Sequence, residues 1–119
     1  MSIKIEEGKP VKISVAGEIL LHDIHQIVDF AEYKLKNKAH VEVYCEAEDE
    51  EGNPTEITPE LMDKILKIYS KVKNKGEFIL VLPVEQIKAQ ISQPKLLQSF
   101  VNFLGLVPLK DVSGGSSEE

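Results

Sequence analysis

Arginine is absent from this sequence of 119 residues, and all 14 basic residues are lysines. Arginine is the side chain best suited to recognising phosphates and bases through paired hydrogen bonds. Proteins that bind nucleic acid also need a basic surface, because they displace counterions from the phosphate backbone. With 20 acidic residues and a net charge of −6, the composition argues against nucleic acid and against an anionic membrane surface as ligands.

Cysteine and long apolar runs are also scarce. The one cysteine, Cys45, cannot form an internal disulfide, so the chain is not adapted to an oxidising compartment. The longest apolar run, Phe78–Leu82, is far shorter than the roughly 18–20 residues that a membrane-spanning helix needs. Residues 1–7 lack the charged and then apolar pattern of an export signal. We therefore expect a cytoplasmic protein that does not enter a membrane.

The motifs of common catalytic and nucleotide-binding sites are missing as well. None of the seven glycines belongs to a nucleophile elbow, a phosphate-binding loop or a dinucleotide fingerprint. We expect these glycines in turns, at helix ends or in the C-terminal tail. This absence argues against an enzyme, and we predict no catalytic residues and no cofactor.

Two stretches suggest metal binding, but neither has a complete set of ligands. His22 and His25 lie about one helical turn apart, yet a zinc site needs at least three well-placed protein ligands. The acidic segment 46–56 does not fit a calcium loop, because using Gly52 as the loop glycine puts Ala47 at the first ligand position. We therefore predict no metal, two surface histidines, and a solvated acidic loop that could present a negative surface to a basic partner.

The spacing of apolar residues predicts an alternation of strands and helices. Apolar residues at every second position indicate strands, and apolar residues three or four positions apart indicate helices. The expected strands cover residues 3–5, 11–15, 41–45, 78–82 and 106–109. The expected helices cover residues 21–35, 59–75, 84–91 and 94–104.

Strands separated by helices of this length favour crossover connections and a mostly parallel sheet. We expect a small α/β fold in the order β-β-α-β-α-β-α-β, with a mixed, mostly parallel sheet of four to five strands. The unbroken apolar run Phe78–Leu82 predicts a central strand that is covered on both faces. One domain should span residues 1–112, and residues 113–119 should form a disordered tail of serine, glycine and glutamate.

The junction between the acidic segment and the next helix carries helix-start signals. Thr58 is a good N-cap, Pro59 suits the first helical position, and Glu60 follows it. A phosphate on the Thr58 hydroxyl would be stabilised by the free N–H groups of the first turn, although the upstream carboxylates oppose it. Thr58 is therefore either a plain N-cap or a candidate phosphoacceptor.

Four segments of the chain share the order and spacing of one known family. Val11–Ile19 matches a strand that ends in Gly-Glu-Leu-Asp, and Leu20 stands where the aspartate usually does. Leu61–Pro83 matches the second helix and the following strand, Val84–Ile91 the next helix, and Phe103–Leu106 a late Ser/Thr-Gly-Leu segment. This pattern resembles the STAS family, the anti-sigma factor antagonist-like domains.

The resemblance implies a non-catalytic regulatory domain that binds another protein, such as an anti-sigma factor or a histidine-kinase-like regulator. The family motif Asp-Ser/Thr-Ser-Gly-Leu aligns with residues 57–61, so the usual phosphorylated serine falls on Pro59, which has no hydroxyl. The candidate phosphoacceptors are then Thr58 and, second, Thr55. The resemblance places the partner-binding surface at Thr55, Ile57, Thr58, Pro59, Glu60, Leu61 and Met62.

Two alternatives remain open at the level of sequence. A small enzyme or ligand-binding protein would have its site at the carboxyl ends of the parallel strands, where the candidate groups are Glu46, Tyr44 and Glu18. A deep, mostly apolar pocket would favour that interpretation. The third possibility is a structural subunit that associates with itself.

Overall fold

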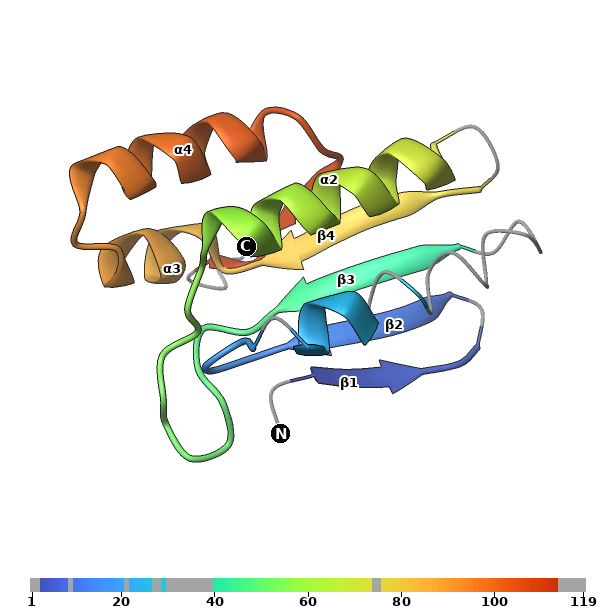
Figure 1. Cartoon of the computed structure of the whole chain (residues 1–119), viewed down its shortest axis with the longest axis horizontal. Coiled ribbons are helices and arrows are strands. Elements are labelled where there is room, and N and C mark those ends of the chain that lie inside the picture. Colours follow the sequence, from blue (N-terminus) through green and yellow to red (C-terminus); the bar gives the residue numbers. More distant parts are fainter. Residues whose placement is uncertain are drawn as a thin grey trace.

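The computed structural model describes residues 3–8, 10–20, 22–26, 29, 40–73 and 76–113. Strands and helices alternate along the chain (Figure 1). The strands are β1 (Ile3–Glu6), β2 (Val11–Val15), β3 (Val41–Cys45), β4 (Phe78–Leu82) and β5 (Leu109–Asp111). The helices are α2 (Pro59–Val72), α3 (Val84–Gln90) and α4 (Pro94–Leu104), and residues 22–26 are also helical.

The five strands form one sheet in which spatial order follows chain order, β1-β2-β3-β4-β5. β1 and β2 form an antiparallel hairpin, and every later neighbour pair is parallel. The predicted fold class, a small α/β fold with a mixed and mostly parallel sheet, is confirmed. The helix predicted over 21–35 is confirmed at 22–26 and 29, and its other positions lie outside the described residues.

The described helices pack on one face of the sheet. A single hydrophobic core joins Ile24, five residues of α2, and residues of α3 and α4 to alternate residues of the strands. From β4 it takes Phe78, Leu80 and Leu82. Figure 1 shows α2 and the 22–26 segment lying in front of the strands. The fold therefore has two layers, helices and sheet, and the hydrophobic core lies between them.

The described helices cover only one face of Phe78–Leu82, so the prediction that this strand is covered on both faces is confirmed only in part. Ile79 is half-buried, and Val81 is buried (7 % exposed) but lies outside the hydrophobic core. The reason is topological. Right-handed crossovers between strands that follow each other in one direction across a sheet put every connecting helix on the same side. The side chains of Lys12, Tyr44 and Ile79 therefore lie on a sheet face without helices in the described part of the chain.

The C-terminal strand begins later than the sequence suggests. Residues 106–109 were expected to be extended, but the N–H of Leu106 bonds the carbonyl of Phe103 at 2.9 Å and continues the turn that ends α4. β5 starts at Leu109. Ser113, expected in the disordered tail, accepts a hydrogen bond from Glu85 N–H at 2.7 Å. The rest of that tail lies outside the described residues.

Candidate functional site

The start of α2 is a capped helix N-terminus. Thr58 has extended backbone angles (φ −121°, ψ 158°), and its Oγ1 accepts a hydrogen bond from Leu61 N–H at 3.1 Å. Pro59 occupies the first turn, where its missing N–H costs nothing. The acidic Glu60 follows and complements the positive end of the helix dipole. The prediction that Thr58 is an N-cap is confirmed.

Only part of the predicted partner-binding segment reaches the surface. Pro59 and Glu60 are exposed, and Thr58 is half-buried. The side chains of the three apolar members belong instead to the hydrophobic core: Ile57, Leu61 and Met62. A partner at this helix start would therefore meet Pro59, Glu60 and the neighbouring loop, whereas the apolar residues hold the helix on the sheet.

Thr55 is a buried clamp between two segments. It is the only buried polar side chain among the described residues, with 4 % of its surface exposed. Its Oγ1 accepts a hydrogen bond from Gly17 N–H at 3.0 Å and donates one to the Glu46 carbonyl. The backbone adds Glu56 N–H to the Gly17 carbonyl at 3.0 Å. The hydroxyl is thus both a donor and an acceptor of hydrogen bonds inside the protein. Thr55 is therefore a poor phosphoacceptor in this conformation.

The acidic segment between β3 and α2 is an ordered hairpin that projects from the carboxyl end of the sheet (Figure 1). Its tip is organised by Asp49, whose Oδ1 accepts hydrogen bonds from Glu51 N–H at 3.0 Å and Asn53 N–H at 2.8 Å. The bond from Asn53 N–H is the main cause that holds the pKa of Asp49 below its usual value. Gly52 adopts a positive φ of 85° at the turn. We call residues 46–56 the acidic hairpin.

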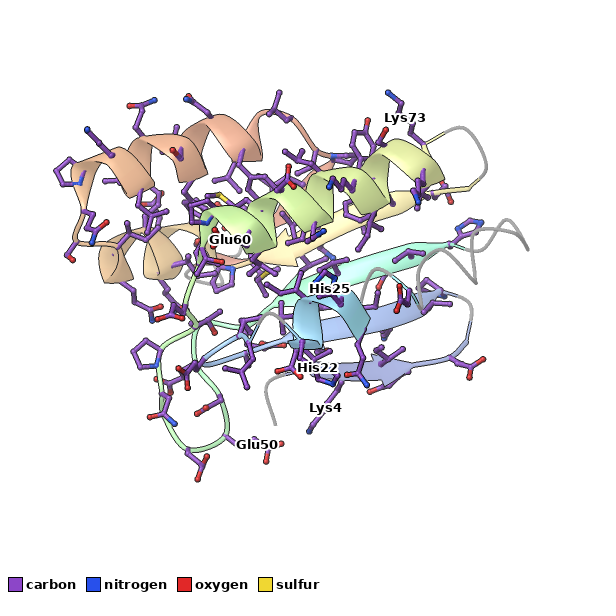
Figure 2. The ribbon with its side chains drawn as sticks, in the orientation of Figure 1. Lys4, His22, His25, Glu50, Glu60 and Lys73 are labelled. Atoms are coloured by element: carbon purple, nitrogen blue, oxygen red, sulfur yellow. The ribbon has the colours of Figure 1, made fainter. Side chains whose placement is uncertain are left out.

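An ion pair joins the acidic hairpin to the edge of the sheet. Lys4 Nζ of β1 lies 2.7 Å from Glu50 Oε1, and both side chains are largely exposed. Figure 2 shows these two side chains beside each other below the sheet, while Glu60 lies at the start of α2. The pairing with Glu50 raises the pKa of Lys4 and lowers that of Glu50. An exposed pair of this kind contributes little stability, so Thr55 is the stronger attachment.

A groove of about 630 Å³ separates the acidic hairpin from the loop that follows β2. Leu20 is 56 % exposed in this groove, although it is a large apolar residue. Five carboxylates line the same groove. We call this feature the acidic groove, and its lining is Glu18, Leu20, Asp23, Asp49, Glu51, Asn53, Pro54 and Glu56.

Sequence reasoning missed the contribution of the loop after β2 to this surface. The available signal was Leu20 itself, which stands where the resembled family has aspartate. An apolar residue that follows a turn and belongs to no helical stripe is a candidate for exposure. Its proximity to a hairpin about 30 positions later is a tertiary fact, made by the Thr55 contact with Gly17.

The groups of the alternative ligand site do not converge. Glu18 lines the acidic groove, and Glu46 lines two other hollows of about 400 and 560 Å³. Tyr44 lies on the sheet face that carries no helix in the described part of the chain, which we call the helix-free face. Its Oη donates a hydrogen bond to Glu42 Oε1 at 2.6 Å. A shared ligand would need these groups around one cavity, and the structure separates them.

The metal and thiol candidates have structural explanations. His22 and His25 are both exposed, and the residues that the structure describes contain no group of three or more potential metal ligands. Cys45 is buried, and this burial raises its pKa to about 12, which keeps the thiol protonated and unreactive. Within the described ranges, no helix has the length and apolar character needed to span a membrane.

Comparisons with known proteins support the fold and leave the family open. No family model matches the chain, and no curated protein matches it. Among solved structures, the chain is similar to the NMR structure of the protein TM1081, with a TM-score of 0.59 and 20 % sequence identity. The match covers 92 % of this chain and 78 % of that one. At this identity the similarity shows a shared small α/β fold and carries no statement about function.

Proposed function

We propose that this chain is a non-catalytic regulatory domain of STAS-like type, which binds another protein through the acidic groove and the adjoining start of α2. One observation carries the proposal: a buried threonine attaches an exposed, highly charged hairpin to the loop after β2. Thr55 is the clamp, with hydrogen bonds to Gly17 and Glu46. A loop that is already ordered avoids part of the entropy cost of binding, which favours a recognition surface over a solvated linker.

The chemistry of the groove supports a partner with a basic surface. Five carboxylates line it, and the sequence has no arginine that could pair with them. Complementary charge steers association and selects among partners, whereas a central apolar contact adds affinity. Leu20 offers that contact. By the resemblance, the partner class is an anti-sigma factor or a histidine-kinase-like regulator.

Thr58 is the candidate for a regulatory phosphate, because its hydroxyl is half-buried and makes one local hydrogen bond. A phosphate there would meet the positive end of α2 and the negative charge of Glu56 and Glu60. Modification would therefore make the groove more acidic and alter binding of a basic partner. The proposal includes a cytoplasmic setting and no nucleic-acid ligand, supported by the single cysteine and the net charge of −6.

The proposal is tested by quantitative affinity capture from lysate of the source organism. The wild-type chain is compared with Leu20→Ser and with the double reversal Glu51→Lys/Glu56→Lys. We expect one or a few proteins to bind the wild type and to be lost with both groove variants. Purified partner and chain then give the dissociation constant, which we expect to rise by at least about tenfold in the double reversal.

The matched control is Glu77→Lys, which reverses an exposed charge at the opposite end of the strands, beside His40. It should capture the same proteins as the wild type. Capture that is absent, or equal for all variants, contradicts the proposal. Intact mass after incubation with host kinases tests the phosphate: we expect an added phosphate that disappears in Thr58→Ala and persists in Thr55→Ser.

A further inference from the structure

The helix-free face of the sheet has a regular pattern of side chains. The strand register aligns them in two rows that cross the sheet. One row runs Glu6, Lys12, Glu42 and Ile79 from β1 to β4. The adjacent row runs Lys4, Ser14, Tyr44, Val81 and Lys110 from β1 to β5.

The two rows differ in the order of their charges and match in the position of their apolar residues. On β1, one row has Glu6 where the other has Lys4. On β4, one row has Ile79 where the other has Val81. Tyr44 connects the two rows at the centre of the face. Its hydroxyl donates a hydrogen bond to Glu42, and Lys12 Nζ lies 5.9 Å from the centroid of its ring. The face thus has an apolar end at β4 and a charged end of both signs at β1.

A parallel sheet is rarely left open on one face. Two such faces can pack against each other about 10 Å apart, with strand directions within about 30° of alignment.

Consider a two-fold axis that lies in the interface and runs across the strands, between the two rows. The rotation leaves each strand opposite its own copy and exchanges the rows. Lys4 of one copy then faces Glu6 of the other, and Ile79 faces Val81.

We propose that this face binds a second copy of the chain in that antiparallel arrangement. The symmetry makes every contact occur twice, so the exchange of rows creates two Lys4–Glu6 pairs. Ile79 faces Val81 twice as well, but Val81 is only 7 % exposed and adds little contact area. A two-fold axis parallel to the strands would instead place Lys4 opposite Lys110, which is repulsive. The charge pattern therefore selects one of the two face-to-face packings.

The size of the face sets the expected strength. Five strands of up to five residues span about 19 Å by 16 Å, or a footprint of about 300 Å². The two copies together would bury about 600 Å², which is below the roughly 1,200–2,000 Å² of specific, stable interfaces, so the dimer should be weak and dependent on concentration. The acidic groove lies at the carboxyl ends of the strands and adjoins this contact, because Asp49 lines both the groove and a hollow that it shares with Lys4 and Glu6.

The test is sedimentation velocity of the full chain from about 10 µM to about 1 mM, the range that brackets a weak dimer. We expect the mass to rise from 13.3 kDa towards twice that value. Lys4→Glu and Glu6→Lys should each weaken dimerisation by about tenfold, because each creates two like-charge contacts. The exchange of both, Lys4→Glu/Glu6→Lys, restores the pairing across the axis and should recover most of the wild-type dimer.

Two controls separate the interface from effects within one copy. Glu50→Gln removes the internal partner of Lys4 and should leave the dimer intact. Lys95→Glu makes the same charge change as Lys4→Glu on the exposed surface of α4 and should also have no effect. A constant mass of 13.3 kDa over the whole range overturns the proposal. So does a dimer that the single reversals do not weaken, or one that the double exchange does not restore.

Discussion

At the scale of single residues, the shape of the proposed binding surface depends on buried groups that would not touch a partner. Thr55 is buried and connects the loop after β2 to the acidic hairpin. The N–H of Gly17 donates a hydrogen bond to the Thr55 hydroxyl, and Gly17 has a positive φ of 71°. A methyl group at Gly17 would also collide with the carboxylate of Asp49. These two residues therefore set the shape of a surface that other residues present.

Replacing Thr55 by valine should destabilise the protein, because valine has the same shape but no hydroxyl. The buried Gly17 N–H loses its acceptor and the Glu46 carbonyl its donor, so we expect the free energy of unfolding to fall by about 1–3 kcal/mol. Urea denaturation measures this change. Thr55→Ser keeps the hydroxyl and should retain most of the stability. Equal losses for both variants would show that the methyl group matters and the hydrogen bonds do not.

A pair of glycines separates backbone strain from steric contact in the same region. Gly17 and Gly52 both have positive φ, 71° and 85°. Alanine at Gly52 would meet no atom within 4 Å, so Gly52→Ala should cost only backbone strain of about 1 kcal/mol. Gly17→Ala should cost clearly more, since it also displaces Asp49. Urea titrations of both variants test this order, and a larger loss for Gly52→Ala would contradict it.

At the scale of elements, α3 illustrates how the end of the chain supports the sheet edge. The residue before α3, Pro83, provides no side-chain cap. The cap comes from the segment at the end of β5. Asp111 Oδ1 accepts from Val84 N–H at 3.2 Å, and Ser113 Oγ accepts from Glu85 N–H at 2.7 Å. The C-terminal strand is thus held to the domain by capping bonds in addition to its ladder with β4.

This cap should make stability depend on acid pH. Hydrogen bonds from the side chain and backbone of Ser113 hold the pKa of Asp111 below its usual value. A carboxylate with a depressed pKa in the folded state stabilises the protein above its unfolded pKa, and this stability is lost as the pH falls through the folded pKa. We expect Asp111→Asn to lower the free energy of unfolding by about 1 kcal/mol near neutral pH, as for loss of a helix cap.

Urea titrations of wild type and Asp111→Asn between about pH 2 and pH 7 provide the measurement. The difference between the two proteins should be constant above the usual pKa of an aspartate and should shrink below it. Glu85→Gln, on the exposed surface of the same helix, is the control for general acid destabilisation. A difference that stays constant down to the lowest pH would exclude a cap that depends on the Asp111 charge.

At the scale of the whole molecule, the protein is a sheet with helices on one face. Sequential strand order places the described helices together, and the hydrophobic core takes only alternate residues from each strand. The other face keeps Lys12, Tyr44 and Ile79 on a surface without helices in the described chain. Stability and association should therefore depend on opposite faces of the same strands.

Neighbouring residues of β4 test this asymmetry. Leu80 is fully buried in the core, and Ile79 is half-buried on the opposite face. We expect Leu80→Ala to lower the free energy of unfolding by about 2–5 kcal/mol. Ile79→Ala should cost about 1 kcal/mol or less. Urea denaturation at low micromolar concentration avoids any contribution from dimers, and similar losses for the two variants would show that both faces are covered.

Local patterns were sufficient to predict most of the fold. The alternation in β2 and β3, the apolar stripe of α2 and the cap at Thr58 each depend on neighbours within a few residues, and each was visible in the sequence. The order of these elements was enough to predict a mixed α/β sheet. The partner, the phosphoacceptor and the family remain predictions, because they rest on a resemblance that no comparison tests.

Tertiary structure decided which residues of the predicted binding segment are exposed and which face of the sheet the described helices cover. Ile57, Leu61 and Met62 look like a recognition motif in sequence but pack into the core. Thr55 becomes a clamp, and Leu20 comes to lie beside the acidic hairpin, because the hairpin folds back on Gly17 across 38 positions of the chain. The apolar sequence of β4 could not show that the described helices pack on one face of the sheet. The side on which a crossover helix packs follows from strand order and handedness, and these depend on contacts between residues far apart in the chain.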